Sequence, residues 1–146
     1  RADPPINFPL IRLADVYLML AECYIFSESG FDKDNAVKYI NKVRTRKGVN
    51  MPEITNGPPQ RAANTKEEVF ERLRHERTIE LAAEGHSFSD MKRWKLLETL
   101  NGPVYGIALY NAYYTRVVTE RDYLWPFPLS ECEKNPDLAK GQNPGW

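Results

Sequence analysis

Residues 65–94 read TKEEVFERLRHERTIELAAEGHSFSDMKRW, and this stretch decides the fold. Thr65 and Glu68 have the spacing of a capping box, in which each side chain binds the other residue's backbone N–H group. They predict a helix over residues 66–84. Gly85 is a natural stop for that helix, because glycine adopts the left-handed conformation that ends many helices.

A second helix follows closely after this stop. Ser87 and Asp90 repeat the capping-box spacing and predict a helix over residues 88–97. The stretch therefore indicates two helices joined by a tight turn.

The charged residues of the first predicted helix fall on its apolar side. At 100° per residue, one arc contains the apolar and charged side chains of Val69, Phe70, Leu73, Leu81, Ala83, Glu76, Arg77, Glu80 and Glu84. A surface helix carries its charges opposite the apolar stripe, so these charges must be partly buried, which is costly unless cations meet the carboxylates. The local cations that we expect to complete a structural ion-pair network are Arg74, Arg77 and Arg93.

Two interpretations of the glutamates remain open at this point. Glu76, Glu80 or Glu84 could act as a general acid or base or as a metal ligand, since paired carboxylates perform glycoside hydrolysis. Alternatively, these glutamates belong to a structural ion-pair network that fixes how two helices cross. A zinc-protease motif beginning at His75 would need its second histidine at position 79, which is Ile79. With only two histidines and no nucleophile–base set, the chain favours the structural interpretation, and we expect no catalytic residue and no metal site.

The composition is that of an ordinary globular chain. The 146 residues include 20 basic and 20 acidic side chains, so the formal net charge is zero and no nucleic-acid or anionic-membrane footprint is indicated. No run of 18 apolar residues is present. Cys23 and Cys132 lie outside any metal-ligand spacing, and we expect Cys23 to be a buried free thiol. We expect no cofactor.

Two further helices are predicted before the central stretch. Residues 10–27 are apolar around most of the helix circumference, which is typical of a helix covered on two sides, so a short chain should leave a patch near Val16, Leu20 or Tyr24 exposed. Asp32 or Asp34 can cap a helix that runs to residue 47. The small and large residues of these two helices resemble the interlock of a tetratricopeptide hairpin.

The remainder, from residue 100 onward, has no clean period. Its tyrosines could form a platform for stacking against sugar rings, and the candidates are Tyr105, Tyr110, Tyr113 and Tyr114. The alternative is that these tyrosines cover the helices and reach water with their hydroxyls. Residues 130–133 can form a single helical turn, and the prolines of 123–128 favour an extended strip.

Five motifs in fixed order resemble the C-terminal region of the SusD/RagB family. They are R-L-A-D-V-Y-L-M-L-A-E at 12–22, N-K-V-R-T-R-K-G at 41–48, E-R-x-x-E-L-x-x-E-G-H-x-F-x-D-x-x-R-W at 76–94, Y-L-W-P-F-P at 123–128, and N-P-D-L with Q-N-P-G-W at 135–146. One departure is Ser87, where many members have arginine. The resemblance covers nearly the whole chain.

The resemblance implies a mainly α fold of tetratricopeptide-like hairpins in an α–α superhelix, with an irregular, extended C-terminal tail packed on the helices. We expect a single domain over 1–146, helical over 1–100 and loop-rich over 101–146, that is the C-terminal piece of a larger protein. The implied function is non-enzymatic binding of nutrients, most often oligosaccharides, by a surface-facing lipoprotein of the bacterial outer membrane.

The implied partners are a TonB-dependent transporter, a glycan ligand and the remaining N-terminal part of the same protein. Two other classes stay open. The first is a helical-repeat adaptor that binds protein, although three or more repeat units are normally needed and one hairpin is found. The second is a hydrolase that uses the central glutamates.

Overall fold

The computed structural model describes residues 10–54, 63–104 and 114–146. The chain forms two compact units, residues 1–87 and residues 88–146, so the division falls before position 100. That the whole chain folds as one domain stays a prediction. Within the described ranges, no helix is both long and apolar enough to cross a bilayer.

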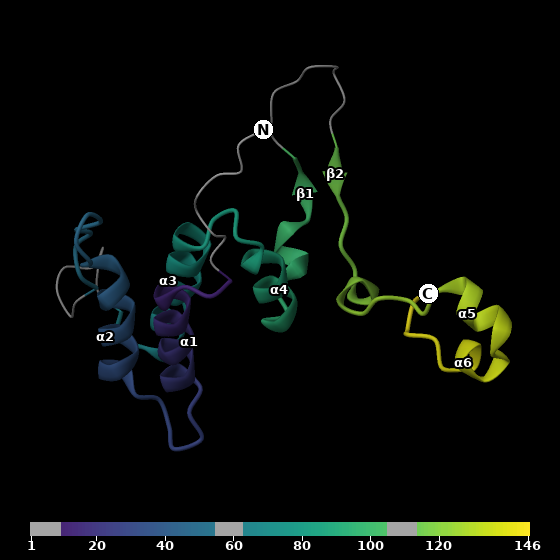
Figure 1. Ribbon diagram of the computed structural model, residues 1–146, viewed down its shortest axis with the longest axis horizontal. Helices are drawn as coiled ribbons and strands as arrows, with labels where there is room; N and C mark the ends of the chain where they lie inside the picture. The colour runs from purple at the N-terminus through teal and green to yellow at the C-terminus, as the bar shows by residue number, and fades with distance from the viewer. Residues whose placement is uncertain (1–9, 55–62, 105–113) are drawn as a thin grey trace, which may run out of the picture. The chain divides into compact units, whose positions relative to one another are not determined.

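The first unit contains three helices in mutual contact: α1 (Leu13–Ile25), α2 (Lys33–Arg44) and α3 (Lys66–Glu80), as Figure 1 shows. The largest fully buried side chains come from all three helices: Leu18, Ile25, Ile40, Val43, Val69 and Leu73. Burial of these side chains stabilises the unit by roughly 1.5–3 kcal/mol each.

The predicted caps at two helix starts are confirmed. The side chain of Asp32 accepts a hydrogen bond from the Asn35 N–H group at the start of α2. At the start of α3, Thr65 and Glu68 form the complete capping box. These bonds satisfy N–H groups that have no partner inside the helix.

The predicted end of α3 was four residues too late. The helix ends at Glu80, and Ala83 (φ 65°) and Gly85 (φ 84°) have left-handed backbones that turn the chain before α4. Glu84 therefore lies in a turn. Similarly, α1 begins at Leu13 and not at residue 10, and α2 ends at Arg44 and not at residue 47.

Helices α1 and α2 form the predicted tetratricopeptide-like hairpin. The small residues Ala21 and Ala36 are fully buried, and the larger Ile40 packs in the same core. Tyr24 and Tyr39 stack with ring centroids 5.7 Å apart. Small residues at the contact allow the two helix backbones to approach closely.

The second unit takes in most of α4 (His86–Arg93), followed by η1 (Leu97–Leu100). The predicted Ser87–Asp90 capping box is wrong, because α4 already begins at His86 and Asp90 accepts a hydrogen bond from Arg93. The single helix predicted over 88–97 is also wrong. Lys95 adopts a left-handed backbone (φ 57°) that separates α4 from η1.

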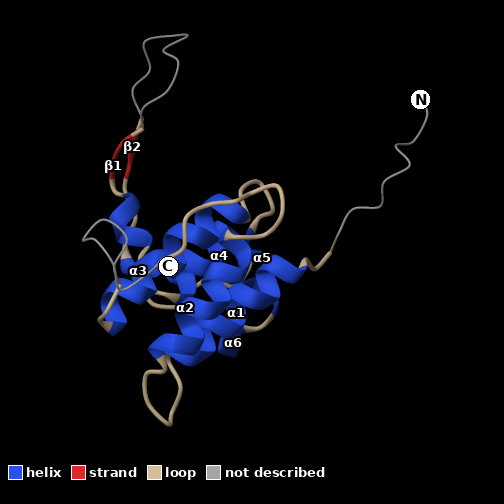
Figure 2. Ribbon diagram, turned by 90° about the vertical axis from the view of Figure 1, so that its left-hand side faces the viewer, coloured by secondary structure: helices blue, strands red, loops and turns tan. Residues whose placement is uncertain are grey.

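Short elements make up the rest of this unit. Strands β1 (Gly102–Pro103) and β2 (Thr115–Arg116) pair antiparallel, with Gly102 opposite Arg116 (Figure 2). They are followed by η2 (Glu120–Tyr123), α5 (Leu129–Lys134) and α6 (Pro136–Lys140).

The tail is held by specific side chains. The buried Tyr123 hydroxyl accepts a hydrogen bond from the Leu97 N–H group and donates one to Glu98. The Trp146 indole donates to the carbonyl oxygens of Arg121 and Leu124. The mainly α fold with an extended, loop-rich C-terminal part is therefore confirmed.

Both cysteines are free thiols, but Cys23 is exposed and not buried as expected. It lies on the side of α1 opposite Leu18 and Ala21, which face the core. Cys132 is half-buried on α5.

Candidate functional site

The glutamates of the central motif lie against arginines from other segments of the first unit. Glu76 and Arg77 are buried within α3, whereas Glu80 ends the helix and Glu84 lies in the following turn. The cations that meet these carboxylates come from the start of α1 and from the end of α2. Charges far apart in sequence are therefore brought together by the packing of three helices.

Arg12, the N-cap residue of α1, binds both of the later glutamates. Its Nε and Nη2 atoms donate to the two carboxylate oxygens of Glu84 at 3.0 and 2.6 Å. Its Nη1 atom donates to Glu80 Oε1 at 3.0 Å, and Nη2 also reaches the Glu80 carbonyl oxygen at 2.8 Å. A bidentate guanidinium–carboxylate pair is geometrically specific, so Arg12 fixes the start of α1 against the end of α3.

Two arginines complete the network: Arg44, the last residue of α2, and Arg46, which follows the end of that helix. Arg44 Nη1 donates to Glu76 Oε2 at 2.6 Å, and Arg44 Nε donates to the Pro52 carbonyl oxygen at 2.9 Å. Arg46 donates to Glu80, whose carboxylate therefore has two arginine partners. The network joins α1, α2 and α3.

The most buried ion pair joins α3 to α1. Arg77 Nη1 donates to Asp15 Oδ1 at 3.0 Å, and the two side chains are only 4% and 11% exposed. A charge at this depth is tolerated only when an opposite charge and hydrogen bonds meet it.

The local arginines expected as partners occupy different places. The Arg74 guanidinium lies 5.2 Å from the centre of the Phe70 ring, and its buried Nε has no hydrogen-bond partner among the described residues. Arg93 donates to Asp90 one turn earlier in α4. The partners that sequence reasoning missed are Arg12, Arg44, Arg46 and Asp15. Their only signal was the presence of charges inside two of the family motifs.

The network also changes the proton affinity of its members. Hydrogen bonds from Arg12 are the largest cause that lowers the pKa of Glu84 below its ordinary value of 4.5. The same bonds raise the pKa of Arg12 above its usual range. Glu84 is therefore ionised at neutral pH and unsuited to donate a proton, which a general acid must do.

A surface hollow of about 330 Å³ lies beside these side chains. Glu76 and Glu80 line it together with His75, Ile79 and Met51. Both carboxylates carry arginine partners at this wall, so the hollow does not offer them as free groups. Within the described ranges, no three His, Cys, Asp or Glu side chains are grouped so that they could hold a metal ion.

Of the four tyrosines predicted as stacking candidates, only Tyr114 lies among the described residues. Tyr105, Tyr110 and Tyr113 lie outside the described residues. Tyr114 directly precedes β2, and its carbonyl oxygen accepts a hydrogen bond from the Val104 N–H group at 2.8 Å. Tyr114 is 72% exposed, so the interpretation that it covers the helices does not fit.

A second aromatic surface in this unit was missed by the sequence analysis. The Lys92 ammonium lies 5.4 Å from the Phe88 ring centre and 5.2 Å from that of Trp125. Both rings are exposed to solvent. Only the i, i+4 spacing of Phe88 and Lys92 on a helix could have indicated this contact.

The fold and the paired carboxylates define a class of protein: a helical scaffold with tetratricopeptide-like hairpins, in which the central charges connect helices. The SusD family model matches residues 5–146. The chain therefore belongs to the SusD family, and it corresponds to that family's C-terminal region.

Individual relatives agree with this assignment. SusD-like protein P25 of Formosa agariphila is 36% identical over 139 residues, which are 92% of this chain and 23% of that protein. SusD-like protein P2 of the same organism is 32% identical over 145 residues, covering 96% of this chain and 26% of that protein.

A solved structure gives the same result. The crystal structure of a SusD superfamily protein from Bacteroides vulgatus aligns with a TM-score of 0.58 at 33% identity, covering 86% of this chain and 25% of that one. The chain thus spans about a quarter of the length of the relatives that it matches.

Proposed function

We propose that the full-length protein is a non-catalytic binding protein that captures nutrients, most often oligosaccharides, at the bacterial outer membrane. Membership of the SusD family is the observation that carries this proposal. Proteins of this family generally bind nutrients and take part in their uptake, and they are generally not enzymes. In this proposal the protein is lipid-anchored, faces outward and passes its ligand to a TonB-dependent transporter.

The arrangement of the central glutamates supports a binding protein over a hydrolase. A glycosidase needs one carboxyl group that donates a proton and a second that acts as base or nucleophile. Glu76 and Glu80 are each bound by arginine, and Glu84 is held ionised by Arg12. In the proposed function these carboxylates stabilise the helices that support the binding surface.

We propose that Tyr114, next to strand β2, belongs to a stacking surface for sugar rings. The support is the exposure of Tyr114 directly before β2, and the three further tyrosines that the sequence carries between β1 and β2: Tyr105, Tyr110 and Tyr113. An aromatic face binds the C–H face of a pyranose ring without any need for a shifted pKa.

The test is calorimetric titration of the full-length protein with a panel of oligosaccharides. For a ligand that binds, Tyr114→Ala should weaken the affinity about tenfold, because roughly 1.4 kcal/mol of stacking is lost. Val117→Ala is the matched control, since Val117 is equally exposed next to the same strand but has no ring. Equal affinities of Tyr114→Ala and the unmodified protein would place the site elsewhere, and the absence of binding across nutrient classes would contradict the proposed function.

A further inference from the structure

Two aromatic rings and one ammonium group form an exposed surface on the second unit. Phe88 and Lys92 lie one turn apart on α4, and Trp125 comes from the segment that follows η2. The Lys92 ammonium lies 5.4 Å from the Phe88 ring centre and 5.2 Å from that of Trp125. Phe88 is 52% and Trp125 is 74% exposed. We call these three residues the Lys92 surface.

The sequence around Trp125 holds its backbone in place. Pro126 disfavours a helical backbone at the residue before it, and the side-chain amide of Asn143 donates a hydrogen bond to the Trp125 carbonyl oxygen. The Gln142 amide binds both the N–H group and the carbonyl oxygen of Phe127. A ring on a fixed backbone loses little conformational freedom when a ligand stacks on it. Trp125 is therefore preorganised for binding.

The Lys92 ammonium has no oxygen partner within the described ranges of the chain. The carboxylate that feels its charge is that of Asp122, whose oxygens accept hydrogen bonds from the N–H and hydroxyl groups of Thr119. The Thr119 N–H bond is the largest cause that lowers the pKa of Asp122, and the charge of Lys92 contributes less. The three N–H donors of Lys92 therefore remain available to a ligand.

This combination of groups fits a sugar that carries a negative charge. Exposed aromatic rings offer faces on which the C–H face of a pyranose ring can stack. An ammonium between the rings can donate charge-assisted hydrogen bonds to a carboxylate or sulfate group, and such bonds are roughly twice as strong as neutral ones. A neutral sugar in the same place would cover the half-buried Lys92 without neutralising it, which is costly.

We propose that the Lys92 surface is a binding site for an acidic sugar residue, with the rings of Phe88 and Trp125 against the sugar ring and the ammonium on its carboxylate or sulfate group. This inference rests on the proposed function, because it names the class of oligosaccharide that the protein captures. It does not involve Tyr114, so the two surfaces can be tested independently.

The test is calorimetric titration of the full-length protein with charged probes and their uncharged counterparts. The probes are oligogalacturonate with its methyl ester, and a κ-carrageenan oligosaccharide with its desulfated form. A charged probe should bind about tenfold or more tightly than its counterpart, because only the charged form can pair with Lys92. Preference for one of the two distinguishes a carboxylate site from a sulfate site. No binding of either charged probe, or affinities equal to those of the uncharged forms, would overturn the inference.

Variants locate the binding on the Lys92 surface. Lys92→Gln should weaken binding of the charged probe about tenfold and leave that of its counterpart unchanged. Trp125→Ala should weaken the binding of both, because stacking is lost. Lys140→Gln on α6 is the control, since it removes an exposed positive charge from the same unit and should change neither affinity. Unchanged affinity for the charged probe in Lys92→Gln or in Trp125→Ala would overturn the inference, and the exposed Trp125 still allows the test if Lys92→Gln does not fold.

The salt dependence gives a second readout that a merely structural role of Lys92 would not change. Raising the NaCl concentration from about 50 mM to about 500 mM should weaken binding of the charged probe severalfold in the unmodified protein and much less in Lys92→Gln. Equal salt dependence in the two proteins would contradict the contact. Binding of uncharged oligosaccharides at normal affinity, with no binding of charged ones, would contradict this inference and leave the proposed function intact.

Discussion

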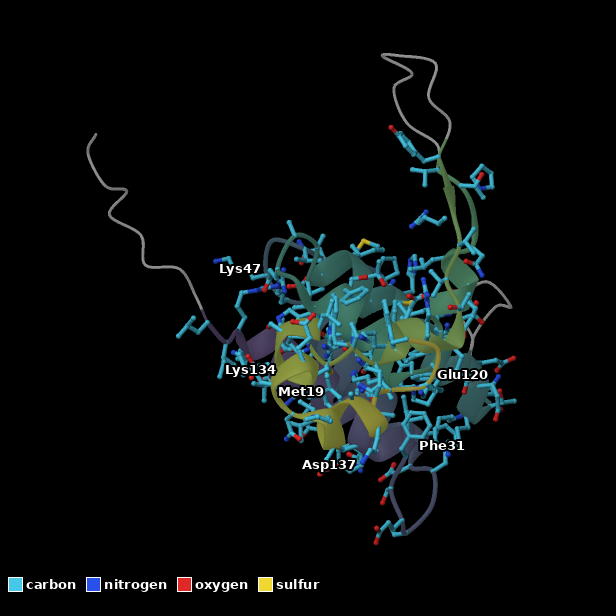
Figure 3. All side chains as sticks on the ribbon, turned by 90° about the vertical axis from the view of Figure 1, so that its right-hand side faces the viewer. Met19, Phe31, Lys47, Glu120, Lys134 and Asp137 are labelled. Carbon is cyan, nitrogen blue, oxygen red and sulfur yellow. The ribbon has the colours of Figure 1, made fainter. Side chains whose placement is uncertain are left out.

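The two units of this protein use charged side chains in different ways. In the first unit, ion pairs join residues 32 to 72 positions apart and bring three helices together. In the second unit, pairs such as Lys134–Glu131 and Lys140–Asp137 lie one helical turn apart at the surface. Figure 3 labels one member of each pair, Lys134 and Asp137. The ion pairs of the first kind hold separate helices together, whereas those of the second kind lie within one helix.

Depth is the physical reason for this difference. Asp15 and Arg77 are removed from water, so loss of the Asp15 charge takes a buried opposite charge away from Arg77 at a depth where water does not replace it. Lys140 and Asp137 are 77% and 85% exposed, and water and salt screen their attraction. The comparison predicts stability effects that decrease as the affected pair becomes more exposed.

The largest effect is expected from Asp15→Asn, which keeps the shape of the side chain but removes the charge facing Arg77. The full-length protein should lose roughly 3–5 kcal/mol of unfolding free energy in urea titration. Lys140→Ala is the control from the second unit and should cost less than about 1 kcal/mol. Equal losses of unfolding free energy in the two variants would contradict the claim that buried ion pairs of the first unit stabilise the fold more than exposed pairs of the second.

Glu80→Ala is expected to have an intermediate effect. From sequence alone, the position of Glu80 among apolar residues predicted a loss of roughly 3–5 kcal/mol. The structure gives Glu80 two arginine partners that retain contact with solvent, so we now expect roughly 2–3 kcal/mol, between the values for buried and exposed pairs. An unchanged urea midpoint would contradict the structural role of this glutamate.

In the second unit, backbone geometry should matter more than charge. A Cβ atom at Gly145 would lie 2.7 Å from Arg121 Cβ, and the residue has a φ of +88°. Gly145→Ala should therefore cost about 1–3 kcal/mol and disturb the Trp146 indole bonds, which tryptophan fluorescence can follow. Gly141→Ala, at a φ of −93° with ordinary contacts, is the control and should be nearly neutral.

Acid should weaken the first unit through Glu84. Because Arg12 lowers the folded-state pKa of Glu84, the unfolded chain binds the proton more tightly. The stabilisation is fully present above the ordinary pKa of 4.5 and is lost as the pH falls from there through the folded pKa. Unfolding midpoints measured at descending pH should fall less in Glu84→Gln than in the unmodified protein. Parallel curves would count against the Arg12–Glu84 contact.

Local signals explain why much of the fold could be predicted from the sequence. The caps at Asp32 and Thr65 and the buried face of Ala36, Ile40 and Val43 depend on residues within a few positions of one another. The burial of Glu76 and Arg77 also followed from helical periodicity alone.

The ion-pair partners could not be predicted in the same way. Arg12 and Glu84 are 72 residues apart, and their contact depends on how α1 and α3 pack. Periodicity gives the face on which a residue lies but not the residue opposite it. Periodicity also did not give the end of α3, so sequence reasoning assigned Glu84 to the helix. In the structure, the left-handed residues Ala83 and Gly85 on either side of Glu84 place it in a turn.

The most direct test of the structural role of these carboxylates is a double-mutant cycle between Arg12 and Glu80 in the full-length protein. Unfolding free energies are measured for the unmodified protein, Arg12→Ala, Glu80→Ala and the double variant. A direct ion pair predicts a coupling energy of about 1 kcal/mol or more, with the double variant losing less than the sum of the single losses. Additivity within about 0.5 kcal/mol would contradict the proposed connection between α1 and α3.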